Sequence, residues 1–246
     1  MPDAYTRRAR IAPVVLAAAP LLPLAITALV QLSAWQKLWA AAWLAVPALV
    51  EELGRDQGRR LQPDLWRSWG GAPTTAMLRR RDTSNRVQVE RRHALLQQVL
   101  GPAPALPTET EEAQDPDGAD AIYETAIGVL KERTRDPTQF PLVLSENARY
   151  GFRRNMLGLR PLGLASSLLG LVIAAVATAS ISASRTAFLT AATIDALLLA
   201  FWWKTVTSAW VQRQAEAYGD ALLRTIEHLA QPQKSGHRPA PPASAR

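Results

Sequence analysis

The chain has 246 residues, enough for one or two domains, and carries a formal net charge of +7 with a pI of about 10.3. It contains no cysteine, which excludes a disulfide framework, thiolate metal sites, iron–sulfur clusters and a cysteine nucleophile. Two strongly apolar blocks flank a charged middle region, and basic segments beside such blocks are typical of membrane proteins that contact anionic lipid. We therefore expect a lipid bilayer, and not nucleic acid, as the partner of these basic segments.

The first apolar run, Ile11–Val30, carries no charged residue and is long enough to cross the hydrocarbon core of a membrane as a helix. The arginines before it, Arg7, Arg8 and Arg10, would also suit the basic region of a cleaved signal peptide. Signal-peptide cores are shorter, however, and a second apolar run follows after only a few residues. We therefore predict a retained span after a cytoplasmic N-terminus of residues 1–10.

The second apolar run, Ala34–Val50, contains tryptophans that recur every four residues, namely Trp35, Trp39 and Trp43. This spacing places them in one stripe along a helix. Such a stripe is typical of packing and of anchoring at the lipid interface, with ligand stacking as the alternative. The two runs together predict a first transmembrane hairpin over residues 11–50.

The charged region 51–161 predicts a mostly helical cytoplasmic insert. Apolar residues recur at helical spacing over 86–100 and 119–135, and residues 145–160 predict a helix that leads into the next span. The stretch near 101–120 is rich in proline and then acidic, which predicts a mobile loop.

The second apolar block, 162–203, predicts another hairpin with its turn at Arg185. Arginine and lysine flank both hairpins mainly on the side of the chain termini, so both termini and the insert are expected in the cytoplasm. An amphipathic helix over 204–230 could pack on the insert or on a neighbouring subunit, and residues 231–246 have the composition of a disordered tail. The expected fold class is an all-α, multi-pass protein of the bacterial inner membrane, with two transmembrane hairpins, or four spans, separated by the insert.

The last span contains a carboxylate, Asp195, close to its centre, where an ionised side chain is costly. No basic residue lies at this depth in the four spans, so we expect Asp195 to be protonated or to touch water in a pore. It could instead specify assembly by hydrogen bonding, and several copies in a homo-oligomer could form an acidic ring that favours cations. On the preceding span, small residues at spacings of four and three predict close helix packing; they are Gly163, Ser167, Gly170, Ala174 and Ala177.

The insert holds one candidate anion or lipid site, in which a glycine turn precedes two threonines and an arginine run. A helix that begins near the threonines could present backbone N–H groups to an anion, and the arginines would add charge. The alternative is a tight turn whose arginines only signal membrane topology. The candidate residues are Gly70, Gly71, Thr74, Thr75, Arg79, Arg80 and Arg81.

The sequence contains no phosphate loop, dinucleotide fingerprint, zinc-protease motif, nucleophile elbow or CxxC pair. The histidines, His93, His228 and His237, have no metal-ligand spacing. Glu51 and Glu52 could act as paired carboxylates, but a solvated helix end is the simpler interpretation. We therefore predict no catalytic residue, no enzyme activity, no metal and no cofactor.

Two stretches, "GGAPTTAMLRRRD" (70–82) and "NARYGFRRNMLGLRPLG" (147–163), resemble segments of uncharacterised bacterial inner-membrane proteins. Those proteins have paired transmembrane hairpins, and some are encoded beside phage-defence genes of the nucleotide-signalling kind. The resemblance implies a membrane effector in antiviral defence, with a nucleotide or a protein as its activator. It carries no residue roles, because no catalytic motif is known for that group.

We expect an oligomeric membrane protein whose cytoplasmic region senses a ligand or partner and whose spans respond, for instance by opening a pore. One alternative is a small cation channel or transporter that uses Asp195. Another is a structural membrane subunit. The sizeable insert and the long helix after the last span favour the first hypothesis.

Overall fold

The computed structural model describes residues 46–103, 105–180 and 185–231, together with Pro13, Leu16, Ala17 and Ala19. The predicted N-terminus (1–10), most of the predicted first hairpin (11–50) and the tail after Gln231 lie outside the described residues. All regular structure within the described part of the chain is helical, which confirms the predicted all-α class.

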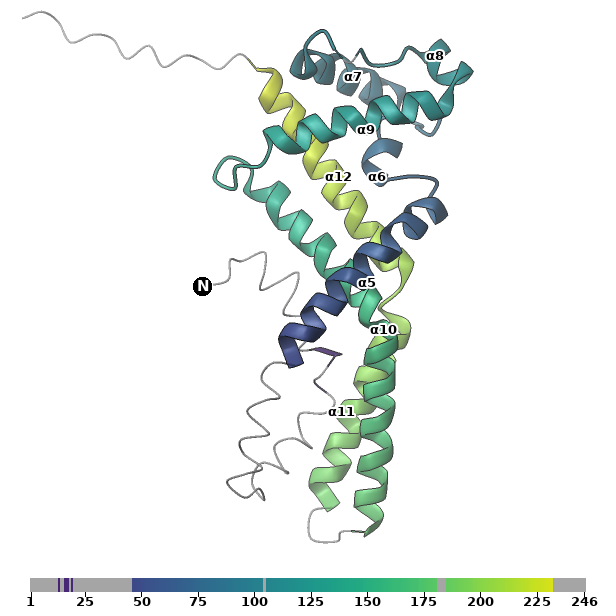
Figure 1. The fold of residues 1–246 in the computed structure, drawn as a ribbon, viewed down its shortest axis with the longest axis vertical. Coiled ribbons are helices and arrows are strands. Elements are labelled where there is room, and N and C mark those ends of the chain that lie inside the picture. The colour runs from purple at the N-terminus through teal and green to yellow at the C-terminus, as the bar shows by residue number, and fades with distance from the viewer. Residues whose placement is uncertain are drawn as a thin grey trace, which may run out of the picture.

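Eight labelled helices follow one another along these residues. They are α5 (Val46–Ser68), α6 (Pro73–Ala76), α7 (Arg86–Leu100), α8 (Glu109–Gln114), α9 (Pro116–Arg133), α10 (Pro141–Ser180), α11 (Arg185–Lys204) and α12 (Ser208–Ala230) (Figure 1).

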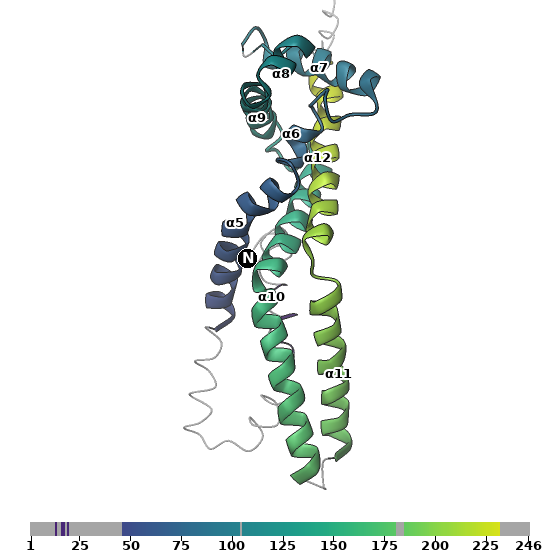
Figure 2. The ribbon, with the colours of Figure 1, turned by 90° about the vertical axis from the view of Figure 1, so that its right-hand side faces the viewer.

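The molecule is elongated and has three parts (Figures 1 and 2). We call residues 161–180 and 185–204 the stalk, where the C-terminal half of α10 and α11 lie side by side. The head consists of α6 to α9 with the C-terminal half of α12. The neck consists of α5, the N-terminal half of α10 and the start of α12, which cross between the head and the stalk.

The head is organised around an apolar core to which α7, α9 and α12 contribute. Leu96, Leu130 and Leu222 are fully buried in it, and Ile226 is almost so. The predicted amphipathic helix over 204–230 therefore packs on the insert of its own chain, since its apolar face is part of this core.

The loop predicted near 101–120 is contradicted in its second half, because α8 and the start of α9 occupy it. A capping box begins α8: the Thr108 hydroxyl accepts from the Glu111 N–H at 3.3 Å, and the Glu111 carboxylate accepts from the Thr108 N–H at 2.8 Å. Asp115 caps α9 by accepting from the Gly118 N–H at 2.9 Å. Side-chain caps thus order a stretch whose composition suggested mobility.

Helix α10 is continuous over 40 residues and passes from the neck into the stalk. It joins the helix predicted over 145–160 to the span predicted from residue 162, and it contains Pro161, which membrane helices tolerate. Its Pro141–Thr178 portion is the one described helix that is by itself long and apolar enough to cross a membrane. Phe188–Lys204 meets the same criterion only together with Ser208–Ala230, from which it is bent by 66°.

The apolar core should dominate the stability of the head. We expect Leu130→Ala to lower the free energy of unfolding by about 2–5 kcal/mol, because it removes buried apolar atoms and leaves a cavity. Val87→Ala is the matched control, since Val87 is 81% exposed. Chemical unfolding of the detergent-solubilised chain, followed by tryptophan fluorescence, measures both. Equal shifts in the two variants would contradict this assignment of the core.

Candidate functional site

Asp195 lies in α11 and points against α10. It is only 2% exposed, and a Cβ placed on Gly170 would lie 2.3 Å from its Oδ2 atom. Its Oδ1 atom has no hydrogen-bond partner among the described residues, and no ion pair within them involves this carboxylate. The stalk therefore encloses an acidic side chain in a contact that only a glycine on α10 permits.

Two of the small residues predicted on α10, Gly163 and Gly170, lie against side chains of α11. A Cβ on Gly163 would lie 2.2 Å from the Trp202 indole, so a second glycine accommodates a second large side chain. Ser167 and Ala174 are also buried, and Ala177 is half-buried. The Ser167 hydroxyl donates to the Gly163 carbonyl at 2.8 Å, so it is engaged within its own helix and does not reach Asp195.

The base of the stalk, next to the neck, is held by polar contacts. Arg160 donates to the carbonyl oxygens of Trp202 and Trp203 at 3.3 and 3.1 Å, at the C-terminal end of α11 where such carbonyls lack helical partners. Ala17, from the first apolar run, is buried at this base, and the Ser166 hydroxyl donates to its carbonyl at 2.9 Å. At this point the first apolar run contacts α10.

Arg79, in the head, is buried and its guanidinium is fully engaged. It donates to both carboxylate oxygens of Asp120 at 2.9 and 2.6 Å, to Asp82 at 2.9 Å and to the Gly70 carbonyl at 2.6 Å. Gly71, with φ +131°, has no room for a side chain, because a Cβ there would lie 2.4 Å from this guanidinium. The glycine turn thus holds an arginine of the same chain and not an external anion.

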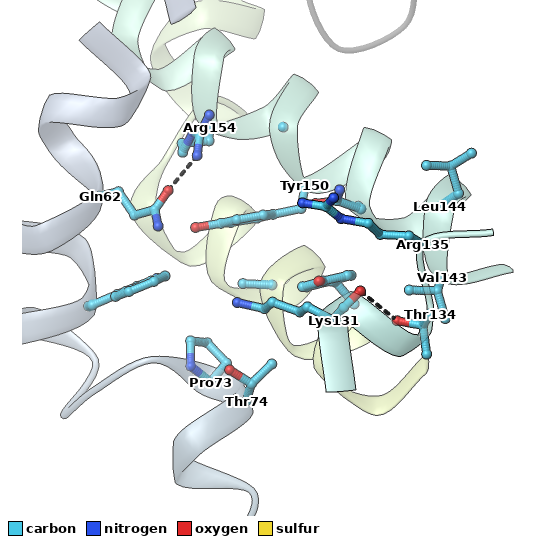
Figure 3. A pocket seen from close by; sticks show the side chains of 15 residues that line it. Gln62, Pro73, Thr74, Lys131, Thr134, Arg135, Val143, Leu144, Tyr150 and Arg154 are labelled. Carbon is cyan, nitrogen blue, oxygen red and sulfur yellow. Dashed lines mark hydrogen bonds between the residues drawn. The ribbon is translucent and has the colours of Figure 1, made fainter. Parts of the chain in front are cut away.

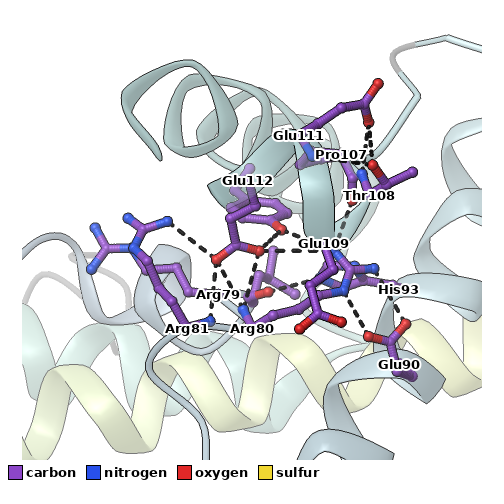
Figure 4. A network of polar contacts seen from close by, with 12 residues as sticks. Arg79, Arg80, Arg81, Glu90, His93, Pro107, Thr108, Glu109, Glu111 and Glu112 are labelled. Carbon is purple, nitrogen blue, oxygen red and sulfur yellow. Dashed lines mark hydrogen bonds and ion pairs between the residues drawn. The ribbon is translucent and has the colours of Figure 1, made fainter. Parts of the chain in front are cut away.

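Glu112, in α8, is the centre of the neighbouring contacts (Figure 4). Its carboxylate accepts from the backbone N–H of Arg80 and Arg81 at 3.1 and 3.3 Å and from the Tyr123 hydroxyl at 2.8 Å, and it pairs with the Arg81 guanidinium at 3.2 Å. Arg80 pairs with Glu90 at 2.6 Å. Burial alone would raise the pKa of Glu112, but these donors stabilise the charged form and lower the pKa below its usual range.

The residues of the predicted anion or lipid site are therefore buried or engaged in contacts within the chain; they are Gly70, Gly71, Thr74, Thr75 and the arginines 79–81. Both threonines are buried, and α6 has only four residues. The arginines neutralise carboxylates of α7, α8 and α9, the farthest of which lies 41 residues away in the sequence. Spacing within the sequence could not reveal these partners.

A pocket of about 370 Å³ lies in the neck, lined by residues of α5, α6, α9, α10 and α12 and of the α9–α10 connection (Figure 3). Its cations are Lys131, Arg135 and Arg154, and no aspartate or glutamate lines it. Trp66 and Tyr150 provide aromatic walls. Sequence reasoning missed this neck pocket because its residues are scattered between positions 62 and 218.

Lys131 and Tyr150 extend into the neck pocket from α9 and α10 (Figure 3). Burial lowers the pKa of the Lys131 ammonium group, although the negative charge of Glu124 acts in the opposite direction. Burial raises the pKa of the Tyr150 hydroxyl, although Trp66 and Arg154 beside it act in the opposite direction. The Arg154 guanidinium lies 5.7 Å from the centre of the Tyr150 ring. The arrangement suits the binding of an anion more than acid–base catalysis.

Comparison of the chain with protein-family models, with curated proteins and with solved structures found no match. Within the described residues, no group of three or more histidine, aspartate or glutamate side chains could hold a metal ion. The stalk and the neck pocket are therefore the two features of the described residues that bear on function.

The Glu112 contacts predict a specific dependence of stability on pH. A carboxylate whose pKa is lowered by folding stabilises the protein above its unfolded pKa of about 4.3, and this contribution is lost as the pH falls through the folded value. We expect Glu112→Gln to cost about 1–3 kcal/mol at pH 7 and to flatten the decline in stability below about pH 4. The matched control is Glu109→Gln in the same helix, because Glu109 forms only an exposed pair with Arg86. Unfolding curves between neutral and acidic pH that coincide for wild type and Glu112→Gln would contradict this role.

The Gly170–Asp195 contact predicts a compensating pair of substitutions. Gly170→Ala should lower the thermal stability of the stalk, because the new Cβ would overlap the Asp195 carboxylate. Adding Asp195→Ala to Gly170→Ala should recover much of this loss, and Asp195→Ala alone completes the double-mutant cycle. Gly128→Ala is the control, since open space surrounds that position. Thermal unfolding in detergent measures all four variants. Additive effects of Gly170→Ala and Asp195→Ala would show that the two positions do not interact.

Proposed function

We propose that the chain is an integral protein of the bacterial inner membrane, that it works as an oligomer, and that its cytoplasmic head and neck sense a ligand or partner while the stalk responds within the membrane. The observation that carries this proposal is the exposed apolar surface of the stalk. Residues more than 40% exposed on α10 and α11 include Leu162, Leu168, Leu169, Val172, Val176, Leu189, Ile194, Leu197 and Trp203. Water-soluble monomers rarely expose so much apolar surface on adjacent helices, whereas lipid would cover it.

The base of the stalk has the chemistry of a membrane interface. Trp203 is 64% exposed there, and the Arg160 guanidinium lies 5.9 Å from the centre of its ring. Exposed tryptophan beside basic residues is typical of the lipid–water boundary, and basic residues favour the cytoplasmic side. This supports a cytoplasmic position for the neck and the head.

Continuity of the helices supports transmission from the head to the stalk. In one uninterrupted helix, α10 carries Tyr150 and Arg154 of the neck pocket and Gly170 of the stalk. The other stalk helix, α11, meets α12 at the bend near residues 205–207, and α12 continues into the head core. A rotation of α12 or α9 against α10 would therefore change the packing between α10 and α11.

The enclosed position of Asp195 favours a stalk that changes its packing over a constitutive cation pathway, which would require this carboxylate to face water. The cation channel or transporter and the structural subunit are the competing proposals. The resemblance of 70–82 and 147–163 to membrane proteins near phage-defence genes supports an antiviral effector role for the responding stalk.

Membrane insertion and the role of Asp195 can be tested in one set of experiments. We expect the full chain to stay in the membrane fraction after alkaline carbonate extraction. We expect Asp195→Leu to change dye leakage from liposomes several-fold and to weaken oligomerisation, whereas Asp195→Asn, which keeps the shape and the hydrogen-bonding groups, retains the oligomer. Thr193→Leu, on an exposed face of the same helix, is the control.

Release of the chain by carbonate would contradict the membrane assignment. Unchanged leakage and growth in both Asp195 variants would contradict a role for this residue in the response. Leakage that is constant and selective for cations in the wild type would favour the channel instead.

A further inference from the structure

The neck pocket differs from the other polar surfaces of the molecule in its charge balance. In a second pocket, between α6, α7 and α12, Arg92 lies together with Asp82, Glu216 and Asp220. In the head, the arginines 79–81 all pair with carboxylates. The neck pocket has three cations and no carboxylate in its lining.

These neck cations are positioned on more than one element. Lys131 comes from α9 and Arg135 from the connection that follows it, and Arg154 comes from α10 on the facing side. Arg135 also pairs at 2.9 Å with Glu132, which does not line the pocket. Both side chains are exposed, so replacing this ion pair by a contact with a ligand costs little free energy. Cations that converge from different helices on one space favour a compact anion such as a phosphate group.

The walls of the neck pocket suit a planar ring. Tyr150 is held in place by Tyr218, whose ring centre lies 6.4 Å away with the two planes only 4° apart. Trp66 adds a second aromatic surface. The Gln62 side-chain carbonyl already accepts from Arg154, which leaves its N–H groups to donate to the edge of a heterocycle, and the Asn147 amide can donate or accept there. Aromatic surfaces with nearby amides recognise ligands that carry a flat, hydrogen-bonding ring.

We propose that the neck pocket binds a small organic phosphate with a planar ring, the chemistry of a mononucleotide. Lys131 and Arg135 hold the phosphate group, and Trp66 and Tyr150 contact the ring. The volume of about 370 Å³ lies within the range of small-ligand sites, about 300–1,000 Å³. Binding as such does not depend on the membrane role, but its consequence for the stalk rests on the proposed function, because α10 carries both Tyr150 and Gly170.

The test measures binding by titration calorimetry with the full chain in a mild detergent. The probes are adenosine monophosphate and guanosine monophosphate. Inorganic phosphate and adenosine, the two components of adenosine monophosphate, are tested separately. We expect a monophosphate to bind more tightly than either component. Lys131→Gln combined with Arg135→Gln should lower the affinity for the monophosphate by about tenfold for each lost charged contact. Arg133→Gln is the matched control, because Arg133 lies on the same helix and does not line the pocket.

A second variant separates the ring from the phosphate. Trp66→Leu should lower the affinity for the monophosphate several-fold and leave the affinity for inorganic phosphate unchanged. Circular dichroism and the thermal midpoint of each variant establish that it is folded.

Three results would overturn the proposal. One is the absence of binding by any probe at millimolar concentration to a folded wild-type chain. Another is an equal loss of binding in the Arg133 control. The third is binding of vesicles that contain phosphatidylglycerol, abolished by the Lys131 and Arg135 substitutions, without binding of a monophosphate; the neck cations would then hold a lipid head group. Membrane retention and dye leakage are measured separately, so failure of the proposed function would be distinguished from failure of this site.

Discussion

The distance between the two stalk helices is fixed by two glycines of α10. At Gly163 the Trp202 indole occupies the space of a missing side chain, and at Gly170 the Asp195 carboxylate does. Because the two contacts lie about two helical turns apart, they fix the register of α11 as well as its closeness. The exposed faces of the stalk follow from that register, and so does the position of Arg160 at the end of α11.

The head is specified by a different kind of interaction, a set of buried and half-buried ion pairs. Replacing such pairs by apolar groups is often no loss in stability, so their effect is chiefly to select one arrangement of the helices. Arg79 fixes α9 against the glycine turn through Asp120, and Arg81 fixes α8 through Glu112. Arg79, Arg80 and Arg81 are thereby paired within the head. No aspartate or glutamate is among the described residues that line the neck pocket, where Arg135 pairs with Glu132 outside the lining and Arg154 donates to Gln62.

Local signals in the sequence predicted the helices better than they predicted the contacts. The periodicity over 86–100 has the bounds of α7, and the spacing of Gly163, Ser167 and Gly170 identified the face of α10 that meets α11. The prediction of a loop near 101–120 used composition alone, and the Thr-x-x-Glu signature at Thr108, which begins α8, was not used. Each of these features lies within a few turns of one helix, where spacing determines which residues share a face.

Contacts between distant segments could not be predicted in the same way. An arginine run near a predicted span has the same sequence whether it stays open to lipid or meets carboxylates from a later helix. Arg79 and Asp120 meet only because the apolar core brings α9 beside the glycine turn. The same reasoning applies to Asp195: its central position in the predicted span is evident from the sequence, but its enclosure against Gly170 depends on the packing of two helices. A carboxylate enclosed in this way makes the packed stalk less favourable than an apolar residue would. The proposed response of the stalk would therefore be a change to a second arrangement in which Asp195 gains a hydrogen-bond partner.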